Sequence, residues 1–532
     1  MYATGIYNRK QPHLQATQMN TFNNLSYHRR VIALILFFSL IRLLLASVYG
    51  LANDEAYYWL YSQHLQWSYF DHPPMVAVWI RLFTFNLHFQ QVETFVRLGS
   101  IISYSLSTYI IYRTTSLLQS EKAGWYAACM YTASFYTGII AGIFILPDSP
   151  QMLFWTFSMW MIARIIRNEQ NTWNWILLGI ATGLCIMSKM HGVFIWVGIL
   201  LFVITNKRGW LLKPQFYLAL VITLAIASPI LYWNIQNHFV TYRFQSERVE
   251  IHRFFIDTKS FAEEVLGQLF FNNPFNVIVV ILGCIALLKH KLLPSPALKI
   301  YLFTGVSLSF TLLFVSLFRS TLPHWSGPAY VSLFPIAAIY LAGEKRRTFT
   351  RLPVWALGGH IAFLIGWYLL VNHYPGTLGS KNKYTLGQGD ITLDMYDWKE
   401  AGRSFTSFYR NDVKNGIMPE GAPMVCYTWR EAHLEYYFCQ PGHIQMLGLG
   451  TMDGLHDYMW TNKIRVTSKP DMNHAYCIVP SDEYYDFRRT YSGYYNTFDS
   501  ATVIHTFRGG KPAHSFYVYR LSGWKGHIPM AE

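Results

Sequence analysis

The chain has 532 residues, of which 52% are hydrophobic, 17% are aromatic and only 14% are charged. Soluble domains carry roughly a quarter charged residues, so this composition excludes an ordinary soluble protein and favours a membrane protein. The formal net charge is +14, but the basic residues form short clusters between apolar runs. Because they do not gather into one patch, nucleic acid binding is not expected.

Apolar segments long enough to cross a membrane recur along the first part of the chain, and we identify eleven candidates. With a cytoplasmic N-terminus and alternating directions, every short basic cluster falls inside, as the positive-inside rule requires. A miscounted pair of segments preserves this orientation, so we expect about 11–13 transmembrane helices. Polar residues 1–27 precede the first segment without a cleavable signal, which indicates a signal anchor. The segments are 30–51, 95–115, 123–146, 150–166, 174–189, 191–206, 214–233, 274–290, 297–318, 325–343 and 353–372.

Residues 373–532 are predicted to form a separate soluble α/β domain on the outer side, after a transmembrane domain over residues 1–372. Strand-like runs alternate there with helix-like runs, which is typical of a small sheet domain. Its three cysteines, Cys426, Cys439 and Cys477, allow one disulfide at most, and no Cys/His spacing indicates a metal site. The strand-like runs are 423–429, 443–449, 475–480, 502–507 and 514–521, and the helix-like runs are 398–410, 431–438 and 482–491.

The first outer loop, residues 52–94, begins with the sequence NDEAYYWLYSQHLQWSYFDHPPM. Asp54 and Glu55 are candidate site residues, but acids also stabilise a helix N-terminus, with Asn53 or Asp54 as its cap. Asp71 and His72 stand before a Pro-Pro pair, which stiffens the chain and fixes where the two side chains point. A solvated turn would more often use Gly, Asn or Ser, so this step favours a functional role.

Other polar residues also fall on the outer face. Asp148, in LPDSP, is an ordinary turn residue at a surface but a functional candidate at membrane depth. Arg97 and Lys189 lie at the outer ends of spans, where a cation either extends harmlessly to the interface or holds an anion. The second long outer loop, 234–273, opens with polar residues that could equally be interfacial anchors. The remaining candidates for substrate binding are His191, Asn234, Gln236, Arg243 and His324.

Several of these segments occur in a familiar order: NDEAYYWLYSQHLQWSYFDHPPM, VRLGS, LPDSP, SKMHG, PILYWNIQNHFVTYRFQ and PHWSGPAY. Together they resemble bacterial GT-C glycosyltransferases of the protein O-mannosyltransferase and lipid A aminoarabinose transferase superfamily, over nearly the whole chain. The resemblance implies a polytopic α-helical GT-C fold with a soluble domain, and a donor sugar on a polyprenyl or dolichyl phosphate. It places a catalytic first-loop acid at Asp54 and a second acid at Asp148. Where aminoarabinose transferases typically carry Glu-Lys, this chain has Asp71 and His72.

The chemistry of such a transfer agrees with the predicted topology. Nucleotide sugars are not available outside the cytoplasmic membrane, so the donor has to be membrane-borne. A carboxylate base, Asp54 or else Asp71, would activate the acceptor hydroxyl. The departing lipid phosphate needs cations, which Lys189, Arg243, His72 or His324 could supply.

A divalent metal held at Asp71 and His72 would serve the departing phosphate equally well, so the cofactor is left open between none and a metal ion. Tyr57 and Tyr58 could stack on sugar and prenyl groups. The expected acceptor is lipid A, another glycan or a protein, and the expected location is the bacterial inner membrane.

Two other functions remain open from the residues alone. A transporter or flippase for a lipid-linked or anionic substrate would line a pathway with polar residues. The spans, however, are poor in charge at mid-membrane, and the polar candidates gather at one face. A membrane-anchored binding protein acting through its C-terminal domain would leave the acids of the outer loops unexplained.

Overall fold

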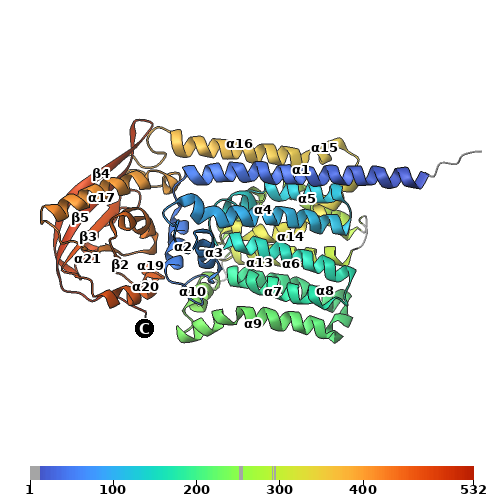
Figure 1. Ribbon diagram of the computed structural model, residues 1–532, viewed down its shortest axis with the longest axis horizontal. Coiled ribbons are helices and arrows are strands. Elements are labelled where there is room, and N and C mark those ends of the chain that lie inside the picture. The colour runs from blue at the N-terminus through green and yellow to red at the C-terminus, as the bar shows by residue number, and fades with distance from the viewer. Residues whose placement is uncertain (1–11, 251–255, 290–291, 293–294, 532) are drawn as a thin grey trace, which may run out of the picture.

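A computed structural model describes residues 12–250, 256–289, 292 and 295–531. Long helices run side by side in a bundle, and a sheet domain lies at one end of it (Figure 1). The N-terminal end of α1 lies at the opposite end of the bundle (Figure 1). The bundle contains α1 (Pro12–Val48), α4 (Glu93–Leu118), α5 (Glu121–Ala133), α6 (Asp148–Arg167), α7 (Thr172–Ser188), α8 (Val193–Asn206), α9 (Pro214–Gln236), α12 (Pro274–Leu288), α13 (Pro296–Ser316), α14 (Gly327–Gly343) and α16 (Leu352–His373).

Each of the eleven predicted segments overlaps a helix of this bundle, and the polytopic helical fold is confirmed. A helix suits a bilayer because it satisfies all of its backbone hydrogen bonds internally. By length and composition alone, five helices of the described residues could cross a membrane, and a sixth follows if one bent pair is counted as a single span. The five are Ser26–Val48, Pro214–Gln236, Pro296–Ser316, Pro323–Gly343 and Arg347–His373.

The predicted segment 123–146 is not one continuous helix. The α-helix α5 ends at Ala133, and a π-helical turn, η1 (Tyr136–Ile140), follows. The buried Arg42 side chain of α1 supports this turn, because its Nε donates to the Gly138 carbonyl at 3.0 Å. Gly138 is required there by close packing, since a Cβ atom would lie 2.5 Å from the His360 ring. A buried cation thus has a structural partner inside the bundle.

The two long segments that the sequence predicts to lie outside the membrane, here called the outer segments, contain helices. Residues 52–94 include α2 (Asn53–Gln63) and α3 (Met75–Phe83), and residues 234–273 include α10 (Val240–Val249) and α11 (Thr258–Phe271). The axes of α11 and α12 meet at 96°. Asn273 holds this bend, because its side-chain amide donates to the carbonyls of Ala133 and Ala356 at 3.0 and 3.1 Å. Of these helices, α2, α3 and α10 lie at the end of the bundle that faces the sheet domain (Figure 1).

The sheet domain has five strands in the order β2-β1-β3-β5-β4. β1 pairs in parallel with β2 and β3, whereas β5 is antiparallel to β3 and β4. Every strand overlaps a predicted strand-like run, since short apolar runs bounded by polar turns are a strong strand signal. The strands are β1 (Met424–Cys426), β2 (Met446–Gly448), β3 (His474–Pro480), β4 (Tyr495–Arg508) and β5 (Lys511–Trp524).

Helices cover this sheet. In α17 the buried side chains Trp398, Phe405 and Tyr409 lie on one face, and the Phe405 ring packs edge-on against Tyr476 of β3. All six cysteines are unpaired, so the one disulfide that the sequence allowed does not form. The helices are α17 (Trp398–Lys414), α18 (Ala432–Leu434) with the π turn η7 (Glu435–Cys439), α19 (Met452–Leu455), α20 (Tyr458–Arg465) and α21 (Phe487–Tyr491).

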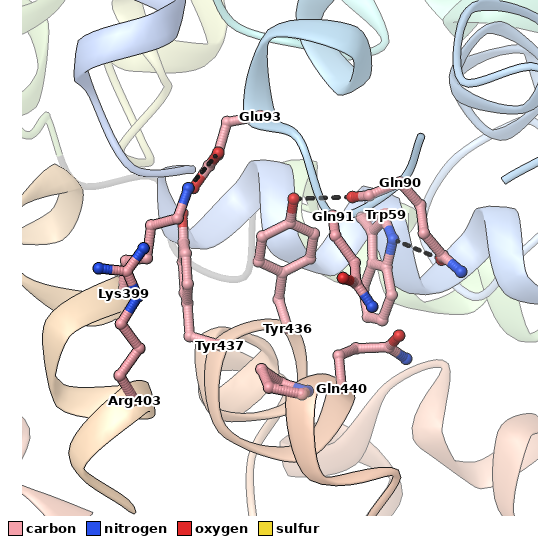
Figure 2. A pocket seen from close by; sticks show the side chains of 10 residues that line it. Trp59, Gln90, Gln91, Glu93, Lys399, Arg403, Tyr436, Tyr437 and Gln440 are labelled. Carbon is pink, nitrogen blue, oxygen red and sulfur yellow. Dashed lines mark hydrogen bonds and ion pairs between the residues drawn. The ribbon is translucent and has the colours of Figure 1, made fainter. Parts of the chain in front are cut away.

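An ion pair and a hydrogen bond join the sheet domain to the first outer segment, residues 52–94. Figure 2 shows Trp59 of α2 and Glu93 of α4 facing Lys399 and Tyr436 of the sheet domain around a cavity of about 170 Å³. Lys399 Nζ lies 3.0 Å from Glu93 Oε2, and the Tyr436 hydroxyl donates to the Gln90 carbonyl at 2.7 Å. These contacts fix the domain over the first outer segment, where the sequence places its acids.

Candidate active site

Asp54 lies in the first turn of α2 with an exposed side chain. The predicted cap, Asn53 or Asp54, is wrong, because the N-cap residue is Ala52 and its backbone N–H donates to Glu55 Oε2 at 2.8 Å. The Glu55 side chain therefore caps the start of α2, a role that the sequence predicted for Asn53 or Asp54. The Asp54 carboxylate is left available for another role.

Glu55 and Arg97 form an ion pair in which neither side chain is exposed. Arg97 Nε donates to Glu55 Oε1 at 2.7 Å, and Arg97 also donates to the carbonyls of Tyr49 and Gly50 at 2.8 and 2.6 Å. Glu55 Oε1 further accepts the backbone N–H of Ile145 at 2.9 Å. The pair joins the end of α1, the start of α2, α4 and the segment before α6, and it fixes the backbone that carries Asp54.

Two residues of the sheet domain lie beside Asp54. The backbone N–H of Asn53 donates to Asp394 Oδ1 at 3.0 Å, and its side-chain amide donates to the Arg430 carbonyl at 2.9 Å. Burial raises the pKa of Asp54, and the charge of Glu55 adds to this, while Lys189 and Arg430 oppose it. The Asp54 side chain is thus exposed to solvent, although it lies where the helical bundle meets the sheet domain. Burial also raises the pKa of Asp394, to about 8.

Asp148 and Lys189 meet at the start of α6 and the end of α7. Lys189 Nζ lies 2.8 and 3.0 Å from the two carboxylate oxygens, and both side chains are almost fully buried. The Tyr136 hydroxyl of η1 donates to Asp148 Oδ1 at 2.8 Å. The charges of Lys189 and Asp148 both act on the pKa of Asp54. Three segments of the chain therefore meet here through Tyr136 of η1, Asp148 of α6 and Lys189, which directly follows α7.

Two predicted histidines surround this pair. The His191 ring centre lies 5.5 Å from that of Trp325, over which Lys189 Nζ lies at 6.0 Å. The His324 ring contacts Phe271 at 5.9 Å. His324 is also close enough to Asp148 to act on it electrostatically. Aromatic rings thus adjoin the buried pair, and the face of Trp325 lies beside the Lys189 ammonium group.

Asp71 and His72 contact the aromatic face of α2. The Tyr61 hydroxyl donates to Asp71 Oδ1, and the Tyr57 hydroxyl lies 3.5 Å from the same oxygen. His72 packs edge-on against Tyr58 with ring centres 5.6 Å apart. Within the described ranges, no three His, Cys, Asp or Glu side chains gather closely enough to hold a metal ion. Asp71 and His72 are therefore not part of such a group in these ranges.

The remaining candidates make local contacts. Asn234 is buried and donates to the Ile230 carbonyl at 3.0 Å, whereas Gln236 is exposed and donates to the Tyr232 hydroxyl at 2.8 Å. Arg243 donates to the carbonyl of His238 through Nε at 3.0 Å. It lines a cavity of about 610 Å³ between α10 and α20, which also involves Phe70 and Trp460. The hydrogen bonds of these three residues are therefore made with residues other than Asp148 and Lys189.

Two cavities of opposite character adjoin residues 52–54. One, of about 400 Å³, is lined by aliphatic and aromatic side chains of α1, η1, α11 and α16, together with Ala52 and Asp394. The other, of about 490 Å³, lies on the sheet domain and is lined mainly by polar residues, including Arg430 and Asp482. Ala52 lines the apolar cavity, and Asn53 donates to the carbonyl of Arg430, which lines the polar cavity, so both cavities lie beside the residues that directly precede Asp54.

Sequence reasoning missed Asp394, Arg430 and Tyr136. Asp394 and Arg430 are single charged residues in short irregular segments of the sheet domain, and only the docking of that domain brings them to α2. Tyr136 resembles any aromatic residue of an apolar run. The π turn that directs its hydroxyl toward Asp148 has no clear sequence signal.

Residues 71–233 match the family of dolichyl-phosphate-mannose-protein mannosyltransferases. The lipid A galacturonosyltransferase RgtD of Rhizobium johnstonii is 22% identical over 394 residues, which cover 73% of this chain and 80% of RgtD. These similarities support a glycosyltransferase of the GT-C superfamily.

Solved structures show the same fold for this GT-C glycosyltransferase. ArnT from Cupriavidus metallidurans bound to undecaprenyl phosphate superposes with a TM-score of 0.62 at 13% identity, covering 93% of this chain and 98% of ArnT. The apo state of the same protein gives a TM-score of 0.59 at 12% identity, with the same coverage. The GT-C enzyme therefore shares with ArnT both the helical bundle and the sheet domain at one end.

The Glu55–Arg97 pair should be indispensable to the folded GT-C enzyme. Arg97→Met leaves a buried carboxylate without its partner, so we expect the free energy of unfolding to fall by about 3–5 kcal/mol. The matched control is Lys399→Met, which breaks the partly exposed pair with Glu93 and should cost at most about 1 kcal/mol. Loss of folded protein on heating in detergent measures both effects. Equal losses for the two variants would contradict the role of Glu55 and Arg97 in fixing α2.

Proposed function

We propose that the chain transfers a sugar from a polyprenyl-phosphate donor to a hydroxyl of a lipid-borne acceptor such as lipid A, at the outer face of the bacterial inner membrane. Two relatives support this choice. RgtD is named as a lipid A galacturonosyltransferase, and ArnT was solved with undecaprenyl phosphate bound. The fold that this chain shares with ArnT supports a donor of the same chemical class.

The two cavities beside Ala52 and Asn53, the residues that directly precede Asp54, carry the proposal. The apolar cavity beside Ala52 suits an isoprenoid or acyl chain, because aliphatic and aromatic side chains line it. The polar cavity beside Arg430 suits a sugar, because aromatic faces such as Trp429 and carboxylates such as Asp482 line it. We therefore assign the carboxylate of Asp54, the next residue in the chain, to the point where a lipid-linked sugar meets a hydroxyl.

In the proposed step, the acceptor hydroxyl oxygen forms a bond to the anomeric carbon of the donor sugar. The bond between that carbon and the phosphate oxygen breaks, and its electron pair leaves with the polyprenyl phosphate. The Asp54 carboxylate accepts the hydroxyl proton and later releases it to solvent. General-base assistance of this kind is typically worth about 10²–10⁴ in rate.

The Asp148–Lys189 pair is proposed to stand beside the departing phosphate. Lys189 supplies a positive charge where negative charge develops, and Asp148 with Tyr136 holds the ammonium group in position. Because Lys189 is almost fully buried, its charge is weakly screened by solvent. Arg243 lines a separate cavity, so we assign the phosphate to Lys189.

Asp54→Asn removes the proposed base with little change in size. We expect turnover to fall by at least about 100-fold, with folded protein and donor binding retained. The measurement is transfer from a purified polyprenyl-phosphate sugar to lipid A, followed by mass spectrometry. Asp499→Asn, on the exposed surface of β4, makes the same chemical change and should keep full activity. Normal turnover in Asp54→Asn would remove Asp54 from the reacting centre.

The pH dependence should report the surroundings of Asp54. A base acts only when ionised, and burial raises the pKa of Asp54. The acid limb of kcat/KM should therefore lie above that of an ordinary carboxyl group. Arg430 lowers the pKa of Asp54, so Arg430→Gln should move this limb to higher pH. Arg410→Gln, exposed on α17, should leave it in place. A limb that does not respond to Arg430→Gln would speak against Asp54 as the titrating group.

The proposed orientation places the sheet domain outside and the loop around α15 (Arg347–Thr350) in the cytoplasm. Single cysteines at Lys414 and Arg347 test this, since both positions are exposed. In spheroplasts, Lys414→Cys should react with a membrane-impermeant maleimide, and Arg347→Cys should react only after permeabilisation. The native cysteines provide the background, because five are buried and Cys284 is partly buried. Reversed labelling would contradict the orientation.

A further inference from the structure

A second cavity lies beside the end of α16, away from the residues that surround Asp54. Its volume is about 690 Å³. It lies between the linker that follows α16 and the tip of the β4–β5 hairpin. Lys381, Lys383 and Lys511 line it together with the aromatic rings of Tyr374 and Phe507. The lining contains no acidic residue.

The three lysines are available to bind an anion. All three are exposed, and none forms an ion pair with another residue in the part of the chain that the structure describes. The nearby buried cation, Arg508, is neutralised by Asp390 at 2.9 Å, with neither side chain exposed. The cavity therefore carries an uncompensated positive charge, which attracts a negatively charged group.

The walls of this cavity are held firmly. Arg508 donates to the carbonyl of Gly376 at 2.9 Å and to that of Val371, in α16, at 3.1 Å. The hairpin tip is a Gly509–Gly510 turn with positive φ at both residues, and a Cβ atom at Gly509 would lie 3.0 Å from Pro375. The hairpin thus packs directly on the linker, and the positions of the lining lysines are set by the fold.

The cavity lies where the bundle meets the sheet domain. Tyr374, in its wall, directly follows α16, and the outward-facing side chains Ile365 and Leu369 of that helix are exposed. Phe507 is 53% exposed at the hairpin, and Leu378 of the linker is also exposed. Exposed apolar side chains beside lysines are typical of a surface that contacts the lipid headgroup region.

We propose that this cavity binds the phosphate headgroup of an anionic phospholipid in the surrounding bilayer. The lysines contact the phosphate, while Phe507 and Leu378 contact the upper part of the acyl chains. Such a lipid bridges the last helix of the bundle and the sheet domain. This site is separate from the proposed donor phosphate at Lys189 and does not depend on the glycosyl transfer reaction.

Calorimetric titration of the purified full-length protein tests the proposal. Dihexanoyl phosphatidylglycerol is the probe, and dihexanoyl phosphatidylcholine and inorganic phosphate are the comparisons. We expect phosphatidylglycerol to bind at least tenfold more tightly than phosphatidylcholine. Inorganic phosphate should bind more weakly as well, because it lacks acyl chains.

Changing the three lining lysines, Lys381→Gln, Lys383→Gln and Lys511→Gln together, should abolish the preference for phosphatidylglycerol. The matched control changes Lys414, Lys469 and Lys525, which are exposed elsewhere on the same domain, and should keep it. Lys511→Gln alone should give an intermediate affinity, which guards against misfolding of the triple variant. The proposal is overturned if the triple variant keeps the preference, or if inorganic phosphate binds as tightly as phosphatidylglycerol.

Discussion

The buried ion pair between Glu55 and Arg97 is the contact on which the site depends. Arg97 donates to two carbonyls at the end of α1, and Glu55 accepts backbone N–H groups from residues 52 and 145. Every one of these groups would otherwise lie unsatisfied where the membrane bundle meets the sheet domain. The pair therefore joins four separate segments of the chain. These contacts hold in place the backbone that carries Asp54.

The charged side chains of Asp54, Asp148 and Lys189 lie at the same end of the bundle as this pair. Asp54 is exposed, whereas Asp148 is buried and paired with Lys189. Burial raises the pKa of Asp54, and the neighbouring cations partly restore its tendency to ionise. A carboxyl group whose pKa is raised in this way accepts a proton more readily than an ordinary carboxylate does. One acid is thus suited to proton transfer, and the other to holding a cation.

The helical bundle and the five strands followed from apolar segments, strand patterns and a family resemblance, which also named Asp148 and Lys189 as candidates without predicting their ion pair. Apolar segments and strand patterns are local signals, and the family resemblance depends on the order of motifs along the chain. Asp394 and Arg430 could not be predicted, because they reach Asp54 only through the docking of the sheet domain. The break near residue 134 was equally hidden, since a π turn supported by the buried Arg42 leaves the hydropathy unchanged.

The central claim is that lipid phosphate and acceptor meet at Asp54. A structure of the enzyme with bound polyprenyl phosphate tests it most directly. The account predicts that the isoprenoid chain occupies the apolar cavity between α1, α11 and α16, with the phosphate within hydrogen-bonding distance of Lys189. A phosphate bound beside Arg243, or in the cavity of Lys381, Lys383 and Lys511, with nothing near Asp54, would contradict it.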